Sequence, residues 1–204
     1  MTDDRRRVLA RVRAALAPLR DRAPMPEYAD DVAFARDVLD GRDLVTAFVE
    51  RLTDAGGLAF VDPRALGAWL VDRGARRGHC DPSLVEALRP ALPAGIAVET
   101  RFERARIDDY DFAITRAAGA IAETGTIVLG DATTSHRLAA LAPWIHVAVV
   151  GRSTIVARVV DALRAAGSDA NVVWCTGPSK TADVEGILVR GVHGPGEQVA
   201  LVVP

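Results

Sequence analysis

The order of hydrophobic and polar residues predicts a helix at the start of the chain, followed by an irregular segment. Apolar residues recur at helical spacing from Val8 to Leu19, and five arginines, at positions 5, 6, 7, 11 and 13, lie largely off this face. This pattern is typical of an amphipathic helix over residues 4–19. Residues 20–30 are poor in apolar side chains and contain prolines, which indicates a linker or extended arm. We therefore expect a helix and arm at residues 1–35 and one larger domain at 36–204.

Helix-like and strand-like runs alternate between residues 41 and 99. The predicted elements are a helix at 41–55, a strand at 58–61, a helix from Pro63 to about Arg76 that ends before Gly78, a short helix near 85–88 and a strand at 96–99. Asp62 has the form of an N-cap because Pro63 follows it at the first helical position, and Asp81 before Pro82 repeats this signal. The alternation favours a parallel sheet covered by helices.

The second half of the chain continues this alternation. The predicted elements are strands at 112–115 and 127–130, a helix at 133–141 capped by Thr133 or Thr134, a strand at 144–150, a helix that carries Ile155, Val156, Val159, Val160 and Leu163 and ends at Gly167, and strands at 172–174 and 199–203. The strand, helix and strand between residues 144 and 174 predict a βαβ unit, whose crossover is right-handed in about 98% of known cases.

Composition and charge narrow the class of protein. A chain of 204 residues with 50% hydrophobic and 25% charged residues is typical of a globular protein. Its net charge of -2 argues against nucleic acid as the main partner, because phosphate-binding surfaces normally show a basic excess. The N-terminus lacks the apolar core of a signal peptide and no run is long enough to span a membrane. We therefore expect a cytoplasmic protein without a membrane span.

Cysteine and histidine offer little metal chemistry. The two cysteines, Cys80 and Cys175, lie far apart in the sequence, so they supply neither an iron–sulfur cluster nor a structural zinc site. The four histidines are also scattered, and we predict no metal site. His146 stands inside an apolar strand and is expected to be a buried, hydrogen-bonded residue, whereas His193 stands between glycines in a loop.

Residues 172–196 are the main candidate for chemistry. A strand-like run is followed by five polar residues that could bind a ligand, namely Ser179, Lys180, Thr181, Asp183 and Glu185. Loops at strand ends often carry ligand groups in α/β proteins, and hydroxyls, an ammonium group and loose amides favour a small anion. The spacing does not match a P-loop, so a nucleoside triphosphate is not expected. The alternative is that Ser179 or Thr181 caps a helix with Asp183 and Glu185 in its first turn.

Two residues are candidates for catalysis, Glu123 and His193. Glu123 could act as a base or nucleophile if its neighbours shift its pKa, or it could be a solvent-facing strand end. His193 could act as an acid, a base or a hydrogen-bond donor. The candidate binding residues around these two are Thr124, Gly125, Thr126, Gly177 and Gly194. Gly125 should also mark a bulge or a close backbone approach.

Three blocks resemble a known family. AIAETGTIVL (120–129), WIHVAVVG (144–151) and TGPSKTADVEGILVRGVHGPGE (176–197) are similar to the LUD domain of the LutC/YkgG family of lactate-utilisation proteins, and the resemblance covers roughly residues 40–204. It implies a three-layer α/β/α fold like that of the NagB/RpiA/CoA-transferase group. It also implies a part in oxidising L-lactate to pyruvate with LutA-like and LutB-like partners, which would carry the iron–sulfur clusters. No cofactor is evident in this chain.

The resemblance leaves the chemical role of this chain open. One hypothesis is a non-redox component of a lactate-oxidising system. A second is an independent enzyme or binding protein for a small anionic ligand, such as a carboxylate, a phosphate or a CoA-type molecule. A third is a scaffold whose polar loop is an interface.

Overall fold

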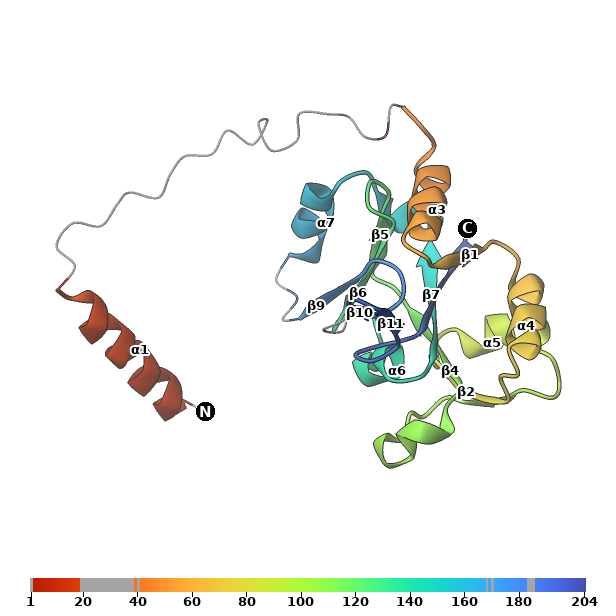
Figure 1. Ribbon diagram of the computed structural model, residues 1–204, viewed down its shortest axis with the longest axis horizontal. Coiled ribbons are helices and arrows are strands. Elements are labelled where there is room, and N and C mark those ends of the chain that lie inside the picture. The colour runs from red at the N-terminus through yellow and green to blue at the C-terminus, as the bar shows by residue number, and fades with distance from the viewer. Residues whose placement is uncertain (1, 19–38, 40, 168, 170, 183–185) are drawn as a thin grey trace. The chain divides into compact units, whose positions relative to one another are not determined.

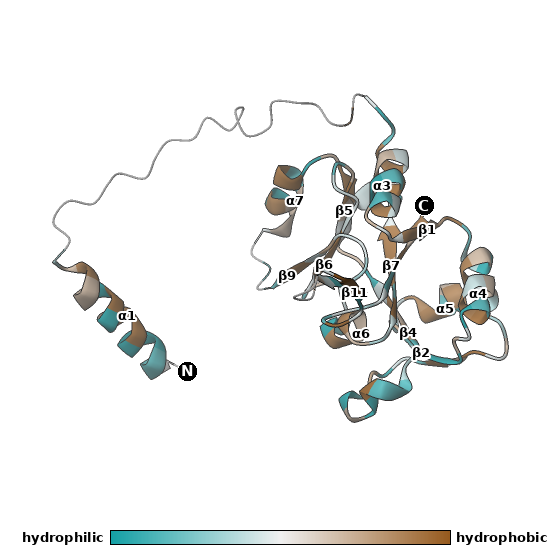
Figure 2. Cartoon of the chain, viewed as in Figure 1, coloured by the Kyte–Doolittle hydropathy of each residue, from teal (hydrophilic) through white to brown (hydrophobic). Residues whose placement is uncertain are grey.

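The computed structural model describes residues 2–18, 39, 41–167, 169, 171–182 and 186–204. The chain divides into two units, Met1–Asp37 and Val38–Pro204. The first contains helix α1 (Thr2–Leu16), which confirms the predicted N-terminal helix, and Figure 2 shows hydrophobic and hydrophilic residues along it. Its apolar side chains, including Val8 and Val12, are exposed. The arm predicted at residues 20–30 lies outside the described residues.

The centre of the second unit is a six-stranded parallel sheet (Figure 1). Its strands, in spatial order, are β1 (Leu58–Phe60), β12 (Glu197–Val203), β7 (Ile145–Gly151), β4 (Phe112–Arg116), β2 (Arg77–Cys80) and β3 (Ala97–Glu99). The inner strands β7, β4 and β12 are nearly continuous apolar runs, as expected of parallel strands buried on both faces. The predicted mainly parallel sheet is thus confirmed.

Helices cover both faces of this sheet. α4 (Pro63–Asp72) and α5 (Val85–Leu88) pack on one face, and α3 (Leu44–Asp54) and α6 (Arg137–Leu141) pack on the other. Three short 3₁₀ turns complete the connections, namely Arg89–Ala91, Arg104–Asp109 and Arg152–Thr154. Asp62 accepts a hydrogen bond of 2.9 Å from the backbone N–H of Arg64, so it caps α4 as predicted.

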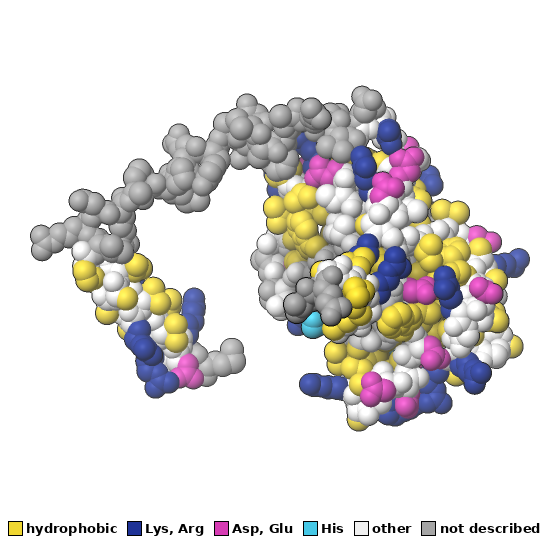
Figure 3. All heavy atoms as spheres, in the orientation of Figure 1, with side chains coloured by type: hydrophobic (Ala, Val, Ile, Leu, Met, Phe, Trp, Pro, Cys, Tyr) yellow, Lys and Arg dark blue, Asp and Glu magenta, His cyan; other side chains and the backbone are white. Residues whose placement is uncertain are grey.

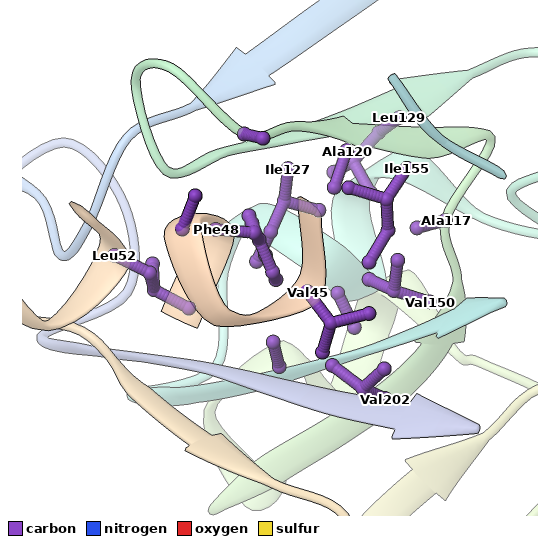
Figure 4. Packing of buried hydrophobic residues seen from close by; sticks show 14 of the residues in the cluster. Val45, Phe48, Leu52, Ala117, Ala120, Ile127, Leu129, Val150, Ile155 and Val202 are labelled. Atoms are coloured by element: carbon purple, nitrogen blue, oxygen red, sulfur yellow. The ribbon is translucent and has the colours of Figure 1, made fainter. Parts of the chain in front are cut away.

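A second, four-stranded sheet lies beyond α3. Its order is β8 (Ile155–Val156), β5 (Gly119–Ile121), β6 (Thr126–Gly130) and β9 (Val172–Cys175). Helix α3 is buried between the two sheets: Figure 4 shows Phe48, which is fully buried, near Ile127 of the second sheet and Val45 near Val150 and Val202 of the central sheet. Helix α7 (Val159–Ala166) packs on this second sheet through Ala162. The two sheets and α3 therefore share one hydrophobic core.

The predicted βαβ unit at residues 144–174 is wrong. β7 pairs with β12 and β4 on its two sides, whereas β9 pairs with β6 in the second sheet. Ile155 and Val156 form strand β8 beside β5, so the helix begins only at Val159. Both neighbours of β7 come from other parts of the chain, and local periodicity carries no information about them.

Two further boundaries differ from the predictions. α4 ends at Asp72, and Gly78 lies inside strand β2, where an added Cβ would stand 2.3 Å from the ring of Phe112. Glycine therefore makes room for an aromatic ring and does not stop the helix. α6 begins at Arg137 after His136, whereas the hydroxyl of Thr134 donates to the carbonyl of Arg116 at 2.9 Å. In the described part of the chain, no helix is long and apolar enough to cross a membrane.

Candidate functional site

The polar block at residues 177–194 forms a β-hairpin. β10 (Lys180–Ala182) pairs antiparallel with β11 (Leu188–Arg190). The backbone N–H of Ser179 donates to the carbonyl of Pro195 at 2.8 Å, and that of Gly191 donates to the carbonyl of Ser179 at 3.0 Å. The alternative, in which Ser179 or Thr181 caps a helix, is therefore wrong, because Thr181 lies in strand β10 and Ser179 directly precedes it. Asp183 and Glu185 lie outside the described residues.

Lys180 extends from the hairpin to the end of α3. Its ammonium group donates to the carbonyl of Ala55, the C-cap residue of that helix. Gly177 passes equally close: it has a φ of +74°, and an added Cβ would stand 2.5 Å from the same carbonyl oxygen. A cation at a helix C-terminus satisfies an unpaired carbonyl and complements the helix dipole. The side chain expected to bind an anion thus has a structural partner.

Threonine side chains join the E-T-G-T turn to this region. The hydroxyl of Thr126 lies 2.7 Å from that of Thr124 and 2.7 Å from that of Thr176, which directly follows β9. The turn at Gly125 has a φ of +66°, and an added Cβ would stand 2.2 Å from the backbone nitrogen of Leu52 in α3. Gly125 is therefore the close backbone approach that the sequence predicted.

Glu123 points to the start of a second helix, α7. Its carboxylate accepts a hydrogen bond of 2.5 Å from the backbone N–H of Val159, the first residue of α7. Negative charge is favourable there because the first N–H groups of a helix have no partner within it. Glu123 and Lys180 thus each contact a helix terminus, on α7 and α3 respectively.

His193 lies beside Ser179 at the open end of the hairpin, where both strands join the rest of the domain. The backbone N–H of His193 donates to the Ser179 hydroxyl at 3.3 Å, and the imidazole is exposed. Pro195 and Gly196 lead directly into β12, so His193 lies near the amino end of the central strands. Loops at carboxyl ends are the usual ligand sites of such sheets, so Ser179 and His193 sit at the opposite edge. The structure brings together Ser179, His193 and Gly194, but groups Lys180 with Gly177 at α3 and Glu123 with α7.

Exposed apolar side chains surround the hairpin. We call Trp144, Leu188, Val189 and Val192 the hairpin patch; their exposed fractions are 53%, 58%, 39% and 54%. Hydrophobic surface is visible in the middle of the face shown in Figure 3, over the position of β11 in Figure 1. Gly191 and Gly196 are needed beneath it, because an added Cβ at either would stand 2.3 Å from the Trp144 ring. Contiguous exposed apolar surface of this kind marks interaction sites.

Sequence reasoning missed a cluster of aromatic rings on the face of β2. The ring of Phe102 lies 5.7 Å from that of His79 and 4.8 Å from that of His136, between centroids. His79 is only 2% exposed, and neither of its ring nitrogens has a hydrogen-bond partner among the described residues. Burial lowers the pKa of His79. The spacing of 57 positions between the two histidines gave no signal, since only the pairing of strands brings them together.

A buried carboxylate lies beside this cluster. Asp81 follows β2 directly and accepts hydrogen bonds from the Ser83 backbone N–H at 2.8 Å and the Ser83 hydroxyl at 2.6 Å. Burial raises the pKa of Asp81, but hydrogen bonds from Ser83 and Ser135 outweigh it, so the pKa lies below its ordinary value. The prediction that Asp81 caps a helix is wrong, because α5 begins at Val85 and its N-cap residue is Leu84. The Asp81 carboxylate instead accepts from Ser83 and Ser135.

His146 is a buried, hydrogen-bonded residue, as predicted. Its Nε2 lies 2.9 Å from the Thr115 hydroxyl and its Nδ1 contacts the side-chain amide of Gln198. Burial lowers its pKa to about 4. Among the described residues, no group of three or more histidine, cysteine or acidic side chains is placed to hold a metal ion.

An open parallel sheet with helices on both faces, a second small sheet and a glycine-rich hairpin at its amino edge define an α/β domain of the LUD type. The LUD domain family model matches residues 49–203, and the chain belongs to this family.

Known relatives agree with this assignment. The chain is 30% identical over 207 aligned residues to Lactate utilization protein C of Deinococcus radiodurans, with 96% of this chain and 93% of the relative covered. It is 35% identical to Lactate utilization protein C of Bacillus licheniformis, but there the alignment covers only 48% of this chain and 44% of the relative. Among solved structures, a DUF162 family protein from Deinococcus radiodurans is similar with a TM-score of 0.59 and 26% identity, over 79% of this chain and 96% of that one.

Proposed function

We propose that the protein is a component of an L-lactate utilisation system, in which lactate is oxidised to pyruvate together with LutA-like and LutB-like proteins that carry iron–sulfur clusters. The observation that supports this most is the nearly full-length similarity to a protein named for lactate utilisation, together with the LUD match over residues 49–203. The chain itself is the non-redox component.

The cysteines of the chain fit such a role. A common iron–sulfur cluster needs four cysteine thiolates, and the sequence has two cysteines. Cys80 lies in β2 and Cys175 in β9, in two different sheets. Burial raises the pKa of Cys80 to about 12 and that of Cys175 to about 11, so both favour the thiol over the metal-binding thiolate. Electron transfer is therefore assigned to the partners.

The hairpin patch is the surface we assign to those partners. It combines exposed Trp144 and Val192 with the exposed Leu188 and Val189 of β11, and aromatic residues are enriched in interface cores. The rigid attachment of the hairpin through Ser179 and Lys180 would hold this surface ready for docking. In this proposal the GPSKTAD and GVHGPGE blocks have a structural role, because they form the hairpin and attach it to the rest of the domain.

Growth tests the pathway. In a host with no second lactate oxidase, deletion of the gene should abolish growth on L-lactate as sole carbon source but leave growth on pyruvate unchanged. A plasmid copy should restore growth. Normal growth of the deletion strain on lactate would rule out the proposal.

Co-purification tests the docking surface. The wild-type protein should retain partners that contain iron, measured as iron per mole of bait, and Leu188→Asp should lose them because a carboxylate would be buried at the interface. Val61→Asp is the matched control, since Val61 is 68% exposed in the loop after β1, away from the hairpin patch. Equal loss with both variants, or retention by both, would contradict the assignment.

A second function is an independent enzyme or binding protein for a small anionic ligand. One observation favours it: a Cβ added at Gly56 would stand 3.2 Å from the Lys180 ammonium and 3.6 Å from the Arg190 guanidinium, so two cations lie around one glycine. A cavity of about 200 Å³ adjoins them, lined in part by Arg73 and Arg190. Paired cations of this kind attract a carboxylate, a phosphate or a CoA-type anion.

Thermal unfolding with candidate anions tests this function. A ligand at a hundredfold excess over its Kd should stabilise the fold by roughly 2.7 kcal/mol, and Arg190→Gln should reduce this shift. Lys180→Ala should reduce it as well, but it also removes the contact with Ala55, so its effect is compared with that of Arg190→Gln. If acetate, phosphate and CoA all leave the unfolding temperature unchanged, this function has no support.

A further inference from the structure

A second cavity lies between the 3₁₀ turn at Arg104–Asp109 and the segment that leads into α6. Its volume is about 720 Å³, within the range of small-molecule sites. Its polar lining consists of Arg104, Asp131, Thr134, Ser135, His136 and Arg137, and aliphatic side chains form the rest. None of the described residues that the sequence suggested for catalysis or ligand binding lines it.

The charges around this cavity leave one cation without a partner. Arg137 forms an ion pair with Asp131 at 2.8 Å, and Asp131 also accepts a hydrogen bond of 2.7 Å from the side chain of Asn171. Arg104 forms no ion pair with any residue that the structure describes. Two arginines face one carboxylate, so the lining carries a net positive charge.

Hydrogen-bonding groups without partners point to the same place. No described residue bonds to either ring nitrogen of His136, and its Nδ1 is buried. His79, whose ring also contacts Phe102, is buried beside it. Buried polar atoms in native proteins almost always have a partner, so such a group indicates a bound molecule or water.

The hydrogen bonds around the cavity keep its wall in place. Ser135 is tied to the buried carboxylate of Asp81, and Thr134 donates to the carbonyl of Arg116 at 2.9 Å. Both bonds hold the segment before α6 against the ends of β2 and β4. His136 is therefore presented from a fixed segment, and its ring is packed on Phe102.

We propose that this cavity binds a 2-hydroxy or 2-oxo carboxylate, with Arg104 on the carboxylate group and His136 on the oxygen at C2. This assignment names the substrate class of the proposed lactate function and rests on it. A guanidinium presents two parallel N–H donors that match a carboxylate. An imidazole without other partners can donate to a carbonyl or accept from a hydroxyl, so it serves both oxidation states. The aliphatic wall, which includes Leu138 and Leu141, faces the alkyl group.

A phosphate would suit this lining less well. Phosphate sites usually gather several backbone N–H groups or more than one free cation, whereas here Arg137 is already neutralised by Asp131. The cavity is also larger than a three-carbon acid. Its volume therefore admits longer acids as well, and the ligand panel includes one.

Titration calorimetry of the full-length protein tests the site with L-lactate, pyruvate, 4-methyl-2-oxopentanoate and inorganic phosphate. We expect at least one of the acids to bind and phosphate to bind more weakly. Arg104→Gln should weaken acid binding about ten- to hundredfold, because a charge-assisted bond is lost. Arg101→Gln is the matched control, with the same charge change on an exposed residue outside the lining, and should change the affinity less than about twofold.

A second readout does not depend on the variants. In histidine-selective NMR spectra the acid should move the resonances of His136 and leave those of exposed His193 in place. Absence of binding by every acid, equal weakening by Arg104→Gln and Arg101→Gln, or tighter binding of phosphate would each overturn the assignment. If the deletion strain fails to grow on lactate but no acid binds, only this site is wrong; if acids bind but the strain grows normally, only the lactate function is wrong.

Discussion

Gly125 shows how one residue can be fixed by a neighbouring element and not by its own loop. Alanine there would combine a positive φ with a Cβ 2.2 Å from the backbone nitrogen of Leu52. We expect Gly125→Ala to lower the free energy of unfolding by at least about 2 kcal/mol, measured in urea. Gly74 has a φ of +74° in open space, so Gly74→Ala should cost about 1 kcal/mol from backbone strain alone. Equal costs at both positions would show that the close approach to α3 contributes nothing.

His146 should make stability depend on pH. Burial lowers its pKa to about 4 from an ordinary value of 6.5, although the hydrogen bond with Gln198 opposes this shift. Between these two values the unfolded chain binds a proton that the folded protein excludes. The free energy of unfolding is therefore fully present above pH 6.5 and should fall as the pH drops towards 4, by about 3 kcal/mol from this residue.

Urea unfolding from pH 7.5 to 4.5 measures this effect. His146→Gln should flatten the dependence on pH, and the remaining slope should include His79, whose pKa is also lowered by burial. His193→Gln is the control, because the His193 side chain is exposed. The same slope in the wild type and in His146→Gln would contradict the assignment.

Among the elements, α7 depends on a side chain from outside the helix. The carboxylate of Glu123 accepts from the backbone N–H of Val159, at 2.5 Å. Glu123→Ala should therefore cost about 1–2 kcal/mol, comparable to loss of an N-cap. Glu123→Gln keeps an acceptor and should cost less than about 1 kcal/mol.

Thermal unfolding of these two variants measures the role of Glu123 in stability, with Glu86→Ala on the exposed face of α5 as the control. Growth on lactate separates structure from chemistry. If Glu123→Gln is stable and supports growth, the residue acts by fixing α7. If the stable variant abolishes growth, the result supports the catalytic role predicted from the sequence.

The sequence was a good guide to elements whose causes are local. Asp62 and Pro63 mark the start of α4 because capping involves only neighbouring residues, and the apolar runs of β7 and β12 mark buried strands. It failed where the cause lies elsewhere in the chain. Ile155 and Val156 fit a helical stripe, but pairing with β5 makes them a strand.

In the candidate site, too, the sequence predicts local features better than contacts between distant segments. Several candidate binding residues lie near one another, since the hydroxyl of Thr126 contacts that of Thr176, directly before Gly177. Which groups the charged side chains contact was not foreseeable, since Lys180 meets Ala55 and Glu123 meets Val159 only after the helices have packed. His79 and His136 both contact the ring of Phe102, and these three residues come from separate segments of the chain. No sequence motif predicts this arrangement.

At the scale of the whole molecule, we expect the N-terminal helix to contribute little to the free energy of unfolding of the domain. Every described residue of the hydrophobic clusters comes from Leu39 onwards, whereas the described side chains of α1 are exposed. An isolated helix of 15 residues is marginal in water, so α1 contributes little by itself. A protein that begins at residue 38 should therefore keep its free energy of unfolding within about 1 kcal/mol of the full-length value.

Tryptophan fluorescence in urea measures this, because Trp69, Trp144 and Trp174 all lie beyond the truncation point. A shorter protein that begins at residue 49 is the control: it lacks Val45 and Phe48 of the shared core and should not fold. A loss well above 1 kcal/mol on removal of residues 1–37 would show that the arm stabilises the domain. If stability is kept but growth on lactate is lost, the apolar face of α1 must act on another molecule, since the domain folds without it.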